Sequence, residues 1–346
     1  MKKVFSIEPV SDNLYNALKE KIDNKTKPIG SLGRLEELAL QIGSIQNTLS
    51  PKLNNPTIIV FAGDHGIANE AVSPYPQEVT KQMVENFLDG GAAINVFCRQ
   101  NGIDLKVVDA GVNADFKQTS KLINAKMGYG TKNFLYEPAM SITEAELAIE
   151  KGAQIARETA NSGCNIIGFG DMGIGNTSSA SIIMSLLGNI PIDRCTGRGA
   201  GLDDDSLGTK KRTLAEAIKK HKIVRLPLSV LSTFGGFEIA MATGAMLAAA
   251  EKKMILLIDG FIISSAFLVA YKIEPNILDY AIFAHRSNEN GHKLMIQLFN
   301  KEPLLDLDMR LGEGTGAALA YPIVAASVNF LNQMASFDSA HVSRAV

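Results

Sequence analysis

Short apolar runs, most of them ending in a glycine-containing turn, constrain the fold of this chain more than any other feature. Five such runs follow residue 56, at 57–66, 105–112, 165–173, 254–260 and 280–285. Strands that are apolar throughout are typical of a sheet buried on both faces, and stretches of helical character separate these runs. The alternation predicts an α/β fold with a parallel sheet. Ligands of such sheets bind beyond the carboxyl ends of the strands, so we expect the chemistry in the glycine-rich turns.

Amphipathic segments at both ends of the chain predict a second, smaller domain. The residues that share a helical face are Leu14, Leu18 and Ile22 in the first segment and Leu35, Leu38, Ile42 and Ile45 in the second. The KPIG sequence at 27–30 breaks the helix between them, and the chain after Gly316 is Ala-rich and helical. We expect a large α/β domain at 50–315 and a small helical domain formed by 1–49 and 316–346.

Two further segments have a predicted structure. Residues 143–161 have helical character, and Thr143 and Glu146 are spaced as a capping box at the helix start. Residues 254–271 form the most apolar stretch, but Asp259 and Gly260 near its middle make it a poor membrane span. We interpret this stretch as a buried strand, a tight turn and a helix.

Composition excludes several classes of protein. Lys and Arg total 34 against 36 for Asp and Glu, so no strong field recruits nucleic acid or a membrane surface. The N-terminus reaches Glu8 before any apolar core, which predicts a cytoplasmic protein without a signal peptide. Three cysteines without regular spacing (Cys98, Cys164 and Cys195) argue against a disulfide framework and a zinc cage, and we expect no bound metal.

The first motif that could carry chemistry is GFGDMGIGNTSSAS at 168–181. Its glycines permit close backbone approach, and the helix expected to start at 176–178 would offer N–H groups to an anion. The motif also contains G-x-G-x-x-G, formed by Gly168, Gly170 and Gly173 with Asp193 about twenty residues later. A nicotinamide-dependent oxidoreductase is therefore an alternative, although Asp171 inside the motif counts against it. A plain structural turn is the other alternative.

The second motif is TGRGAGLDDDS at 196–206. Its alternating glycines suggest a backbone nest for anions. The acidic run at 203–205 lacks the spacing of a calcium loop, so we interpret it as a helix start exposed to solvent. Either Lys210 or Lys211 could fold back onto a phosphate as a point charge.

The third motif is RLGEGTGAALA at 310–320, where Glu313 sits between Gly312 and Gly314 before a helix. The carboxylate could simply satisfy the helix dipole. The functional alternative is a general base on a flexible glycine bracket with room for a flat substrate. His65, His285 and His292 lack metal-ligand spacing, and we expect them to hold loops by hydrogen bonds.

Seven ordered motifs together resemble a known family. They are KPIGSLGRLEELA (27–39), AGDHGIANEAVSPYPQEVT (62–80), GDMGIGNTSSAS (170–181), TGRGAGLDD (196–204), LIDGFIISSAFLVA (257–270), AHRSNENGH (284–292) and LLDLDMRLGEGTGAALA (304–320). The chain resembles the nicotinate-nucleotide:dimethylbenzimidazole phosphoribosyltransferases of cobamide lower-ligand assembly. This resemblance implies a Rossmann-like parallel sheet domain, a small helical domain built from both chain ends, a homodimer and no cofactor.

The resemblance also implies a reaction and its residues. Glu313 matches the catalytic base, which takes a proton from one benzimidazole nitrogen while the other attacks the ribose of nicotinate mononucleotide. The phosphate would be held by Lys210, Ser287, Gly199 and Gly260. The loop facing the nucleotide would contain Gly173, Gly175, Asn176 and Thr177. The wall of the base pocket would contain Gln82, Met172 and Leu311, with Pro74 and Tyr75 nearby, and Gly312 and Gly314 would border the bound substrate.

Asp171 departs from the family pattern, since many members carry a glutamate there. A carboxylate about one methylene shorter would stand back from the ribose or leave room for water. Two further alternatives follow from the resemblance. The aromatic base could be dimethylbenzimidazole, another benzimidazole, adenine or a phenol, and the chain could be a non-catalytic subunit paired with an unlike homologous chain.

Overall fold

The computed structural model describes residues 5–199, 201–221 and 224–343, and within them the chain forms the expected α/β fold. Every neighbouring pair in the sheet is parallel, and the strand order is β3-β2-β1-β4-β5-β6. The strands are β1 (Thr57–Gly63), β2 (Asp104–Gly111), β3 (Leu122–Asn124), β4 (Ile166–Met172), β5 (Ile255–Ile258) and β6 (Ala281–Phe283). The five predicted strands are confirmed. The sequence did not reveal β3, because this three-residue edge strand is only partly buried and has no apolar run.

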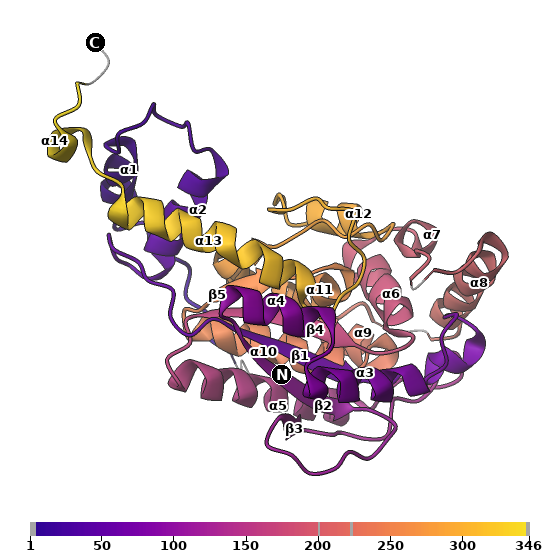
Figure 1. Ribbon diagram of the computed structural model, residues 1–346. Coiled ribbons are helices and arrows are strands. Elements are labelled where there is room, and N and C mark those ends of the chain that lie inside the picture. Colours follow the sequence, from indigo (N-terminus) through magenta and orange to yellow (C-terminus); the bar gives the residue numbers. More distant parts are fainter. Residues whose placement is uncertain (1–4, 200, 222–223, 344–346) are drawn as a thin grey trace.

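Helices cover both faces of the sheet (Figure 1). On one face α10 (Phe237–Glu251) is buried from Phe237 to Ala250 and is packed between the sheet and α5 (Ile142–Asn161). On the other face lie α4 (Ala93–Asn101) and the first half of α13 (Thr315–Gln333). Further helices between β1 and α13 are η1 (Gly66–Glu70), α3 (Glu78–Asp89), α6 (Asn176–Gly188), α7 (Ile192–Cys195), α8 (Asp204–Lys220), α9 (Pro227–Phe234), α11 (Phe261–Ile273), η2 (Pro275–Tyr280) and α12 (His292–Gln297).

The helix predicted over 143–161 begins one residue earlier and has a different cap. Ser141 is the N-cap residue, and its Oγ accepts a hydrogen bond from the Glu144 N–H at 3.2 Å. The Glu144 carboxylate in turn accepts from the Ser141 N–H at 2.7 Å. The capping box predicted at Thr143 and Glu146 is therefore wrong by two residues. Ser141 has the extended backbone that an N-cap needs, whereas Thr143 already lies inside the helix.

The first two long helices and the C-terminal segment meet in a helical lobe beside the sheet, whereas Phe5 and Ile7 pack into the main core (Figure 1). The lobe contains α1 (Tyr15–Asp23), α2 (Arg34–Ile45), the second half of α13 and α14 (Phe337–Ala340). Leu18, Ile22, Ala39 and Leu331 form a small apolar cluster there, separate from the main core. We propose that this lobe is the core of the small helical domain predicted for 1–49 and 316–346, from which Phe5 and Ile7 depart because they pack in the main core. In that division α13 links the domains, because Ala317 and Ala318 belong to the core of the sheet.

The most apolar stretch of the chain folds as predicted into β5, a turn at Asp259 and Gly260, and α11. Among the helices of the described residues, none is long and apolar enough to cross a membrane.

Candidate active site

Glu313 lies on a loop that crosses the carboxyl end of β4. A Cβ atom on Gly170 would lie 2.3 Å from the Glu313 carbonyl oxygen, so only glycine in the strand permits this approach. Gly312, Glu313 and Gly314 all have left-handed backbones, with φ values of 87°, 62° and 85°. A left-handed conformation is unfavourable for glutamate, so the surrounding structure holds Glu313 in place.

The Glu313 side chain points into the protein and is 5% exposed. Its Oε2 atom accepts a hydrogen bond from the Ile94 N–H at 3.3 Å, in the first turn of α4. Burial raises the pKa of Glu313 above its usual value, the Ile94 N–H opposes this shift, and the charge of Asp259 adds to it. A more basic carboxylate is a better general base near neutral pH.

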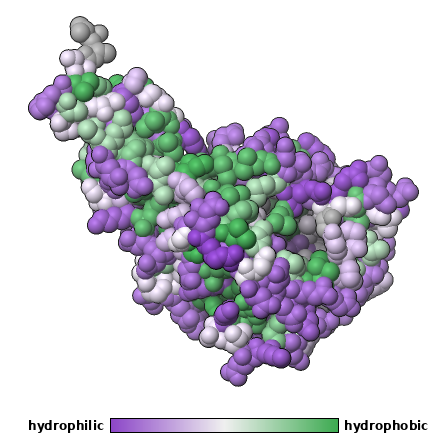
Figure 2. Space-filling model, viewed as in Figure 1, coloured by the Kyte–Doolittle hydropathy of each residue, from purple (hydrophilic) through white to green (hydrophobic). Residues whose placement is uncertain are grey.

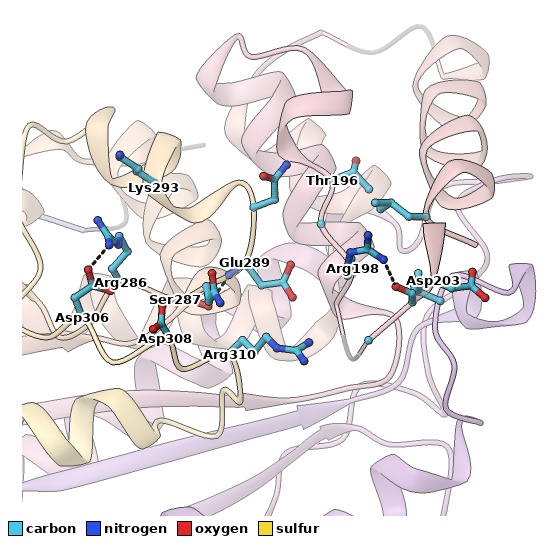
Figure 3. Close-up of a pocket in the computed structure, with 16 residues that line it drawn as sticks. Thr196, Arg198, Asp203, Arg286, Ser287, Glu289, Lys293, Asp306, Asp308 and Arg310 are labelled. Atoms are coloured by element: carbon cyan, nitrogen blue, oxygen red, sulfur yellow. Dashed lines mark hydrogen bonds and ion pairs between the residues drawn. The ribbon is translucent and has the colours of Figure 1, made fainter. Parts of the chain in front are cut away.

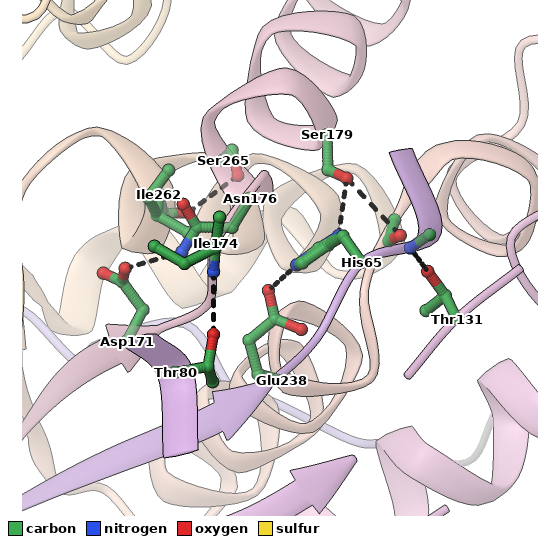
Figure 4. Close-up of polar contacts among 12 residues, drawn as sticks. His65, Thr80, Thr131, Asp171, Ile174, Asn176, Ser179, Glu238, Ile262 and Ser265 are labelled. Carbon is green, nitrogen blue, oxygen red and sulfur yellow. Dashed lines mark hydrogen bonds and ion pairs between the residues drawn. The ribbon is translucent and has the colours of Figure 1, made fainter. Parts of the chain in front are cut away.

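Asp171 connects the first glycine motif to the Glu313 loop. Its Oδ2 atom accepts a hydrogen bond from the Asn176 side-chain amide at 2.9 Å (Figure 4). A Cβ atom on Gly312 would lie 3.5 Å from the same carboxylate. Burial, followed by the charges of Asp259 and Glu238, raises the pKa of Asp171 to about 8. This carboxyl group therefore carries a proton for much of the time at neutral pH.

Close packing inside the sheet, and not dinucleotide binding, explains why residues 168 and 170 are glycines. Both lie inside β4, whereas a dinucleotide fingerprint places its first glycine in the turn after the strand. A Cβ atom on Gly168 would lie 2.9 Å from the Ile58 side chain. The chain needs these glycines so that β1 and the Glu313 loop can pack closely against β4.

Asp259, which follows β5, is the acidic residue at this sheet edge that sequence reasoning missed. It is fully buried, and its Oδ2 and Oδ1 atoms accept hydrogen bonds from the N–H groups of Gly314 at 3.2 Å and Ala317 at 3.0 Å. His285 Nε2 lies 3.5 Å from Oδ1. The position of Asp259, an acidic residue at the carboxyl end of a predicted buried strand, could have identified it as a candidate site residue. In the sequence, Asp259 argues only against a membrane span.

The second glycine motif and Lys210 form a candidate anion site. Lys210 is fully buried on α8, and its Nζ atom donates a hydrogen bond to Thr177 Oγ1 at 2.8 Å. Gly199 lies beside this ammonium group, since a Cβ atom there would be 3.5 Å from Nζ. Glu289 is the carboxylate whose charge acts on Lys210, and no hydrogen bond between the two side chains is present in the described part of the chain. The ammonium has three donors, so it has room for an anion. Lys211 is only half-buried, and the structure therefore selects Lys210.

Gly260 and Ser287 are the other two residues predicted to hold the phosphate. They follow β5 and β6, and a Cβ atom on Gly260 would lie 3.6 Å from Ser287 Cβ. The Ser287 N–H donates to His292 Nδ1 at 2.8 Å, and His292 Nε2 lies 2.9 Å from Ser264 Oγ. Burial lowers the pKa of His292 to about 3, so the ring is neutral and Nδ1 is free to accept.

A cavity of about 980 Å³ opens next to these residues (Figure 3). It lies between the segment that carries Arg286 and Ser287 and the segment that carries Thr196 and Arg198. Arg310 also lines the cavity, and its guanidinium donates to the Gly199 carbonyl at 3.3 Å. The cavity wall is polar and contains both acidic and basic side chains.

The histidines follow the sequence interpretation in two cases of three. His65 Nε2 lies 2.6 Å from Glu238 Oε1, and its Nδ1 lies 3.1 Å from Ser179 Oγ (Figure 4). This buried network supports the glycine loop, because Gly173 and Gly175 both approach the His65 side chain. His292 holds Ser287 as described above. The expectation was wrong for His285, whose two ring nitrogens have no hydrogen-bond partner among the described residues.

The predicted wall of the base pocket comes from three separate segments. Gln82 is exposed on α3, Met172 ends β4 and is half-buried, and Leu311 is 57% exposed before the Glu313 bracket. Pro74 and Tyr75 are exposed in the loop before α3. These side chains are accessible to a ligand, but their grouping into one wall stays a prediction.

Comparison with known proteins gives matches along nearly the whole chain. A family model described as a phosphoribosyltransferase matches residues 7–342. A nicotinate-nucleotide–dimethylbenzimidazole phosphoribosyltransferase of Dechloromonas aromatica (strain RCB) is 56% identical over 342 residues, which cover 98% of each chain. A protein of the same name from Phocaeicola vulgatus is 48% identical over 342 residues, or 99% of each chain. The crystal structure of CobT from Thermus thermophilus has a TM-score of 0.93 and 38% identity, covering 96% of this chain and 99% of that chain.

Proposed function

Because the chain belongs to the nicotinate-nucleotide–dimethylbenzimidazole phosphoribosyltransferase family, we infer that it transfers 5-phosphoribose from nicotinate mononucleotide to an aromatic base in cobamide (vitamin B12) biosynthesis. The base is 5,6-dimethylbenzimidazole or a related compound, and the products are the α-ribazole phosphate and nicotinate. The observation that most supports this function is the buried Glu313, which is held between two glycines beside Asp171.

Glu313 is the general base of the proposed mechanism. Its carboxylate takes the proton from one nitrogen of the benzimidazole while the lone pair of the other nitrogen attacks the anomeric carbon. The bond from that carbon to the nicotinate nitrogen breaks, and its electron pair leaves with nicotinate. Attack from the opposite face converts the β-linked nucleotide into an α-linked one. A raised pKa suits Glu313 to accept this proton, and burial is the main cause of the shift.

The phosphate of the nucleotide is held by Lys210, Gly199, Gly260 and Ser287 in this proposal. Lys210 supplies the charge from a buried position, and the charge of Glu289 favours its ionised form. Gly173, Gly175, Asn176 and Thr177 face the nucleotide from the loop and the first turn of α6. Thr177 connects the two groups through its hydrogen bond with Lys210. Pinning the sugar in this way orients its anomeric carbon for in-line attack.

The buried carboxyl groups of Asp171 and Glu313 suit the charge of the substrate. The pyridinium ring of nicotinate mononucleotide is positive, and positive charge develops on the ribose as the glycosidic bond breaks. Acidic groups in a water-poor site stabilise such charge more strongly than they would in water. We assign Asp171 this electrostatic role in the substrate complex, where the positive ring favours the ionised form of its carboxyl group. Its hydrogen bond to Asn176 sets its position.

The reaction is tested by incubating the purified protein with nicotinate mononucleotide and a panel of bases. The panel contains dimethylbenzimidazole, benzimidazole, adenine and a phenol, and the nucleotide product is identified by its mass. Release of nicotinate with formation of an α-ribazole phosphate supports the proposal. No turnover with any base would refute it and would favour the non-catalytic subunit that the sequence left open.

We further propose a homodimer. Figure 2 shows hydrophobic colouring that extends from the helical lobe to the middle of the molecule, as expected for a surface that another copy covers. Ile29, in the N-terminal segment, is 76% exposed. Light scattering on the purified chain measures the mass directly, and a monomeric mass at micromolar concentration would contradict the proposal. Pairing with an unlike homologous chain and the cytoplasmic location stay predictions.

The proposed phosphate site predicts a pH dependence. Burial lowers the pKa of Lys210 to about 8. Below this pH the free enzyme presents an ammonium group to the phosphate, and above it the charge is lost. We therefore expect kcat/KM for nicotinate mononucleotide to fall as pH rises through about 8, because kcat/KM reports the free enzyme.

The variant Lys210→Arg tests whether Lys210 causes this fall of kcat/KM at alkaline pH, the alkaline limb of the profile. Arginine stays protonated throughout the range, so the limb should disappear in the variant even if its kcat/KM is lower. A limb that persists would belong to another group, such as Asp171, and would contradict the assignment to Lys210.

A further inference from the structure

We propose that Asp259 is the positioning residue of the catalytic base, acting through the glycine bracket that carries Glu313. The inference rests on the proposed role of Glu313 and concerns how the protein gives that side chain its direction and basicity. Asp259 itself lies beneath the bracket and is fully buried, so it acts through Glu313.

The hydrogen bonds of Asp259 fix the turn that sets the direction of Glu313. One carboxylate oxygen accepts from the Gly314 N–H at 3.2 Å, directly after Glu313. The other accepts from the Ala317 N–H at 3.0 Å, in the first turn of α13. These two N–H groups belong to a helix start, where backbone donors lack partners within the helix. One side chain therefore joins the bracket to the helix as a rigid unit.

Close packing around Asp259 makes this arrangement specific. A Cβ atom on Gly316 would lie 2.6 Å from Asp259 Oδ1 and 2.0 Å from the His285 ring. On the opposite side, Gly170 brings β4 against the Glu313 carbonyl. The bracket is thus confined between β4 and the Asp259–His285 pair. This confinement explains how a glutamate keeps the left-handed backbone that places its carboxylate near the Ile94 N–H.

In its ionised form Asp259 also acts on Glu313 through its charge. Burial raises the pKa of Asp259, and His285 and the backbone N–H groups around the carboxylate oppose this shift. The charged and titratable groups that face this region are Asp171 from β4, Asp259 after β5, His285 after β6, and Glu238 at the start of α10. Beyond burial, the pKa of Glu313 is raised by Asp259 and lowered by the Ile94 N–H. The Asp259 carboxylate therefore both orients the Glu313 side chain and makes it more basic.

The experiment uses Asp259→Asn in the full chain, with Asp12→Asn as the matched control. Asp12 is an exposed acid before α1 and does not line the cavity. Asparagine keeps one acceptor oxygen but loses the charge, so we expect kcat to fall roughly 10-fold, with an almost unchanged KM for nicotinate mononucleotide. Because kcat falls at low pH as Glu313 becomes protonated, removal of the neighbouring charge should move this acid limb to lower pH. Circular dichroism and thermal unfolding show whether the variant is folded.

A double-mutant cycle with Glu313→Gln separates positioning from general structural support. If Asp259 acts through the base, Asp259→Asn should cause almost no further loss of kcat once Glu313 is glutamine. A full additional loss, or a fall in kcat without movement of the acid limb, would overturn the inference and leave the role of Glu313 intact. If Glu313→Gln alone keeps the wild-type rate, the proposed function of Glu313 fails instead.

Discussion

The variant Glu313→Gln is expected to lower kcat by about 10² to 10⁴-fold, with an almost unchanged KM for nicotinate mononucleotide. Glutamine keeps the size of the side chain and can still accept from the Ile94 N–H, but it cannot take a proton from the aromatic base. The phosphate site, built around Lys210, stays intact. Steady-state kinetics with dimethylbenzimidazole and nicotinate mononucleotide measures both constants.

Glu302→Gln is the matched control for this prediction. It makes the same chemical change at an exposed glutamate before the bracket, so we expect the wild-type rate. If Glu313→Gln folds like the wild type and retains its kcat, the proton leaves the base by another route and the proposed mechanism is wrong.

The variant Lys210→Met should raise KM for nicotinate mononucleotide by roughly 10- to 150-fold. The expected loss is that of a hydrogen bond to a charged group, about 1.5–3 kcal/mol. Methionine fits the buried channel of the lysine side chain but offers no charge or donor to the phosphate. Once nucleotide is saturating, kcat should change much less, because Glu313 and its bracket belong to other segments.

Lys211→Met removes the same charge from the next residue of α8 and should leave KM nearly at the wild-type value, since Lys211 is only half-buried. Equal effects of the two variants would mean that the overall positive charge of α8, and not a contact with Lys210, attracts the phosphate. That outcome would exclude Lys210 as the specific ligand.

Much of the fold was predictable because the information is local. Buried parallel strands need continuous apolar runs, and five of the six strands have them. The edge strand β3 has no such run, and its pairing is set by β2. The cap of α5 was misplaced because Ser141–Glu144 and Thr143–Glu146 have the same spacing, and only the backbone conformation distinguishes them.

The candidate site residues were predictable where the same motif also contains the glycines that shape the backbone around them. Glu313 is flanked by two glycines, and Thr177 follows the glycine turn that starts α6. Asp259 was missed because its partners, the N–H groups of Gly314 and Ala317, lie 55 and 58 residues away. The choice of Lys210 over Lys211 likewise depends on which face of α8 turns toward Thr177. Tertiary packing decides such contacts.

The role of Glu313 as the base can be seen in a crystal structure of the enzyme with dimethylbenzimidazole and a nucleotide fragment such as ribose 5-phosphate. We expect a carboxylate oxygen of Glu313 within hydrogen-bond distance of one ring nitrogen, the other nitrogen facing the anomeric carbon, and Lys210 on the phosphate. A complex in which the Glu313 carboxylate points into bulk solvent, or is separated from the ring by other side chains, would contradict it.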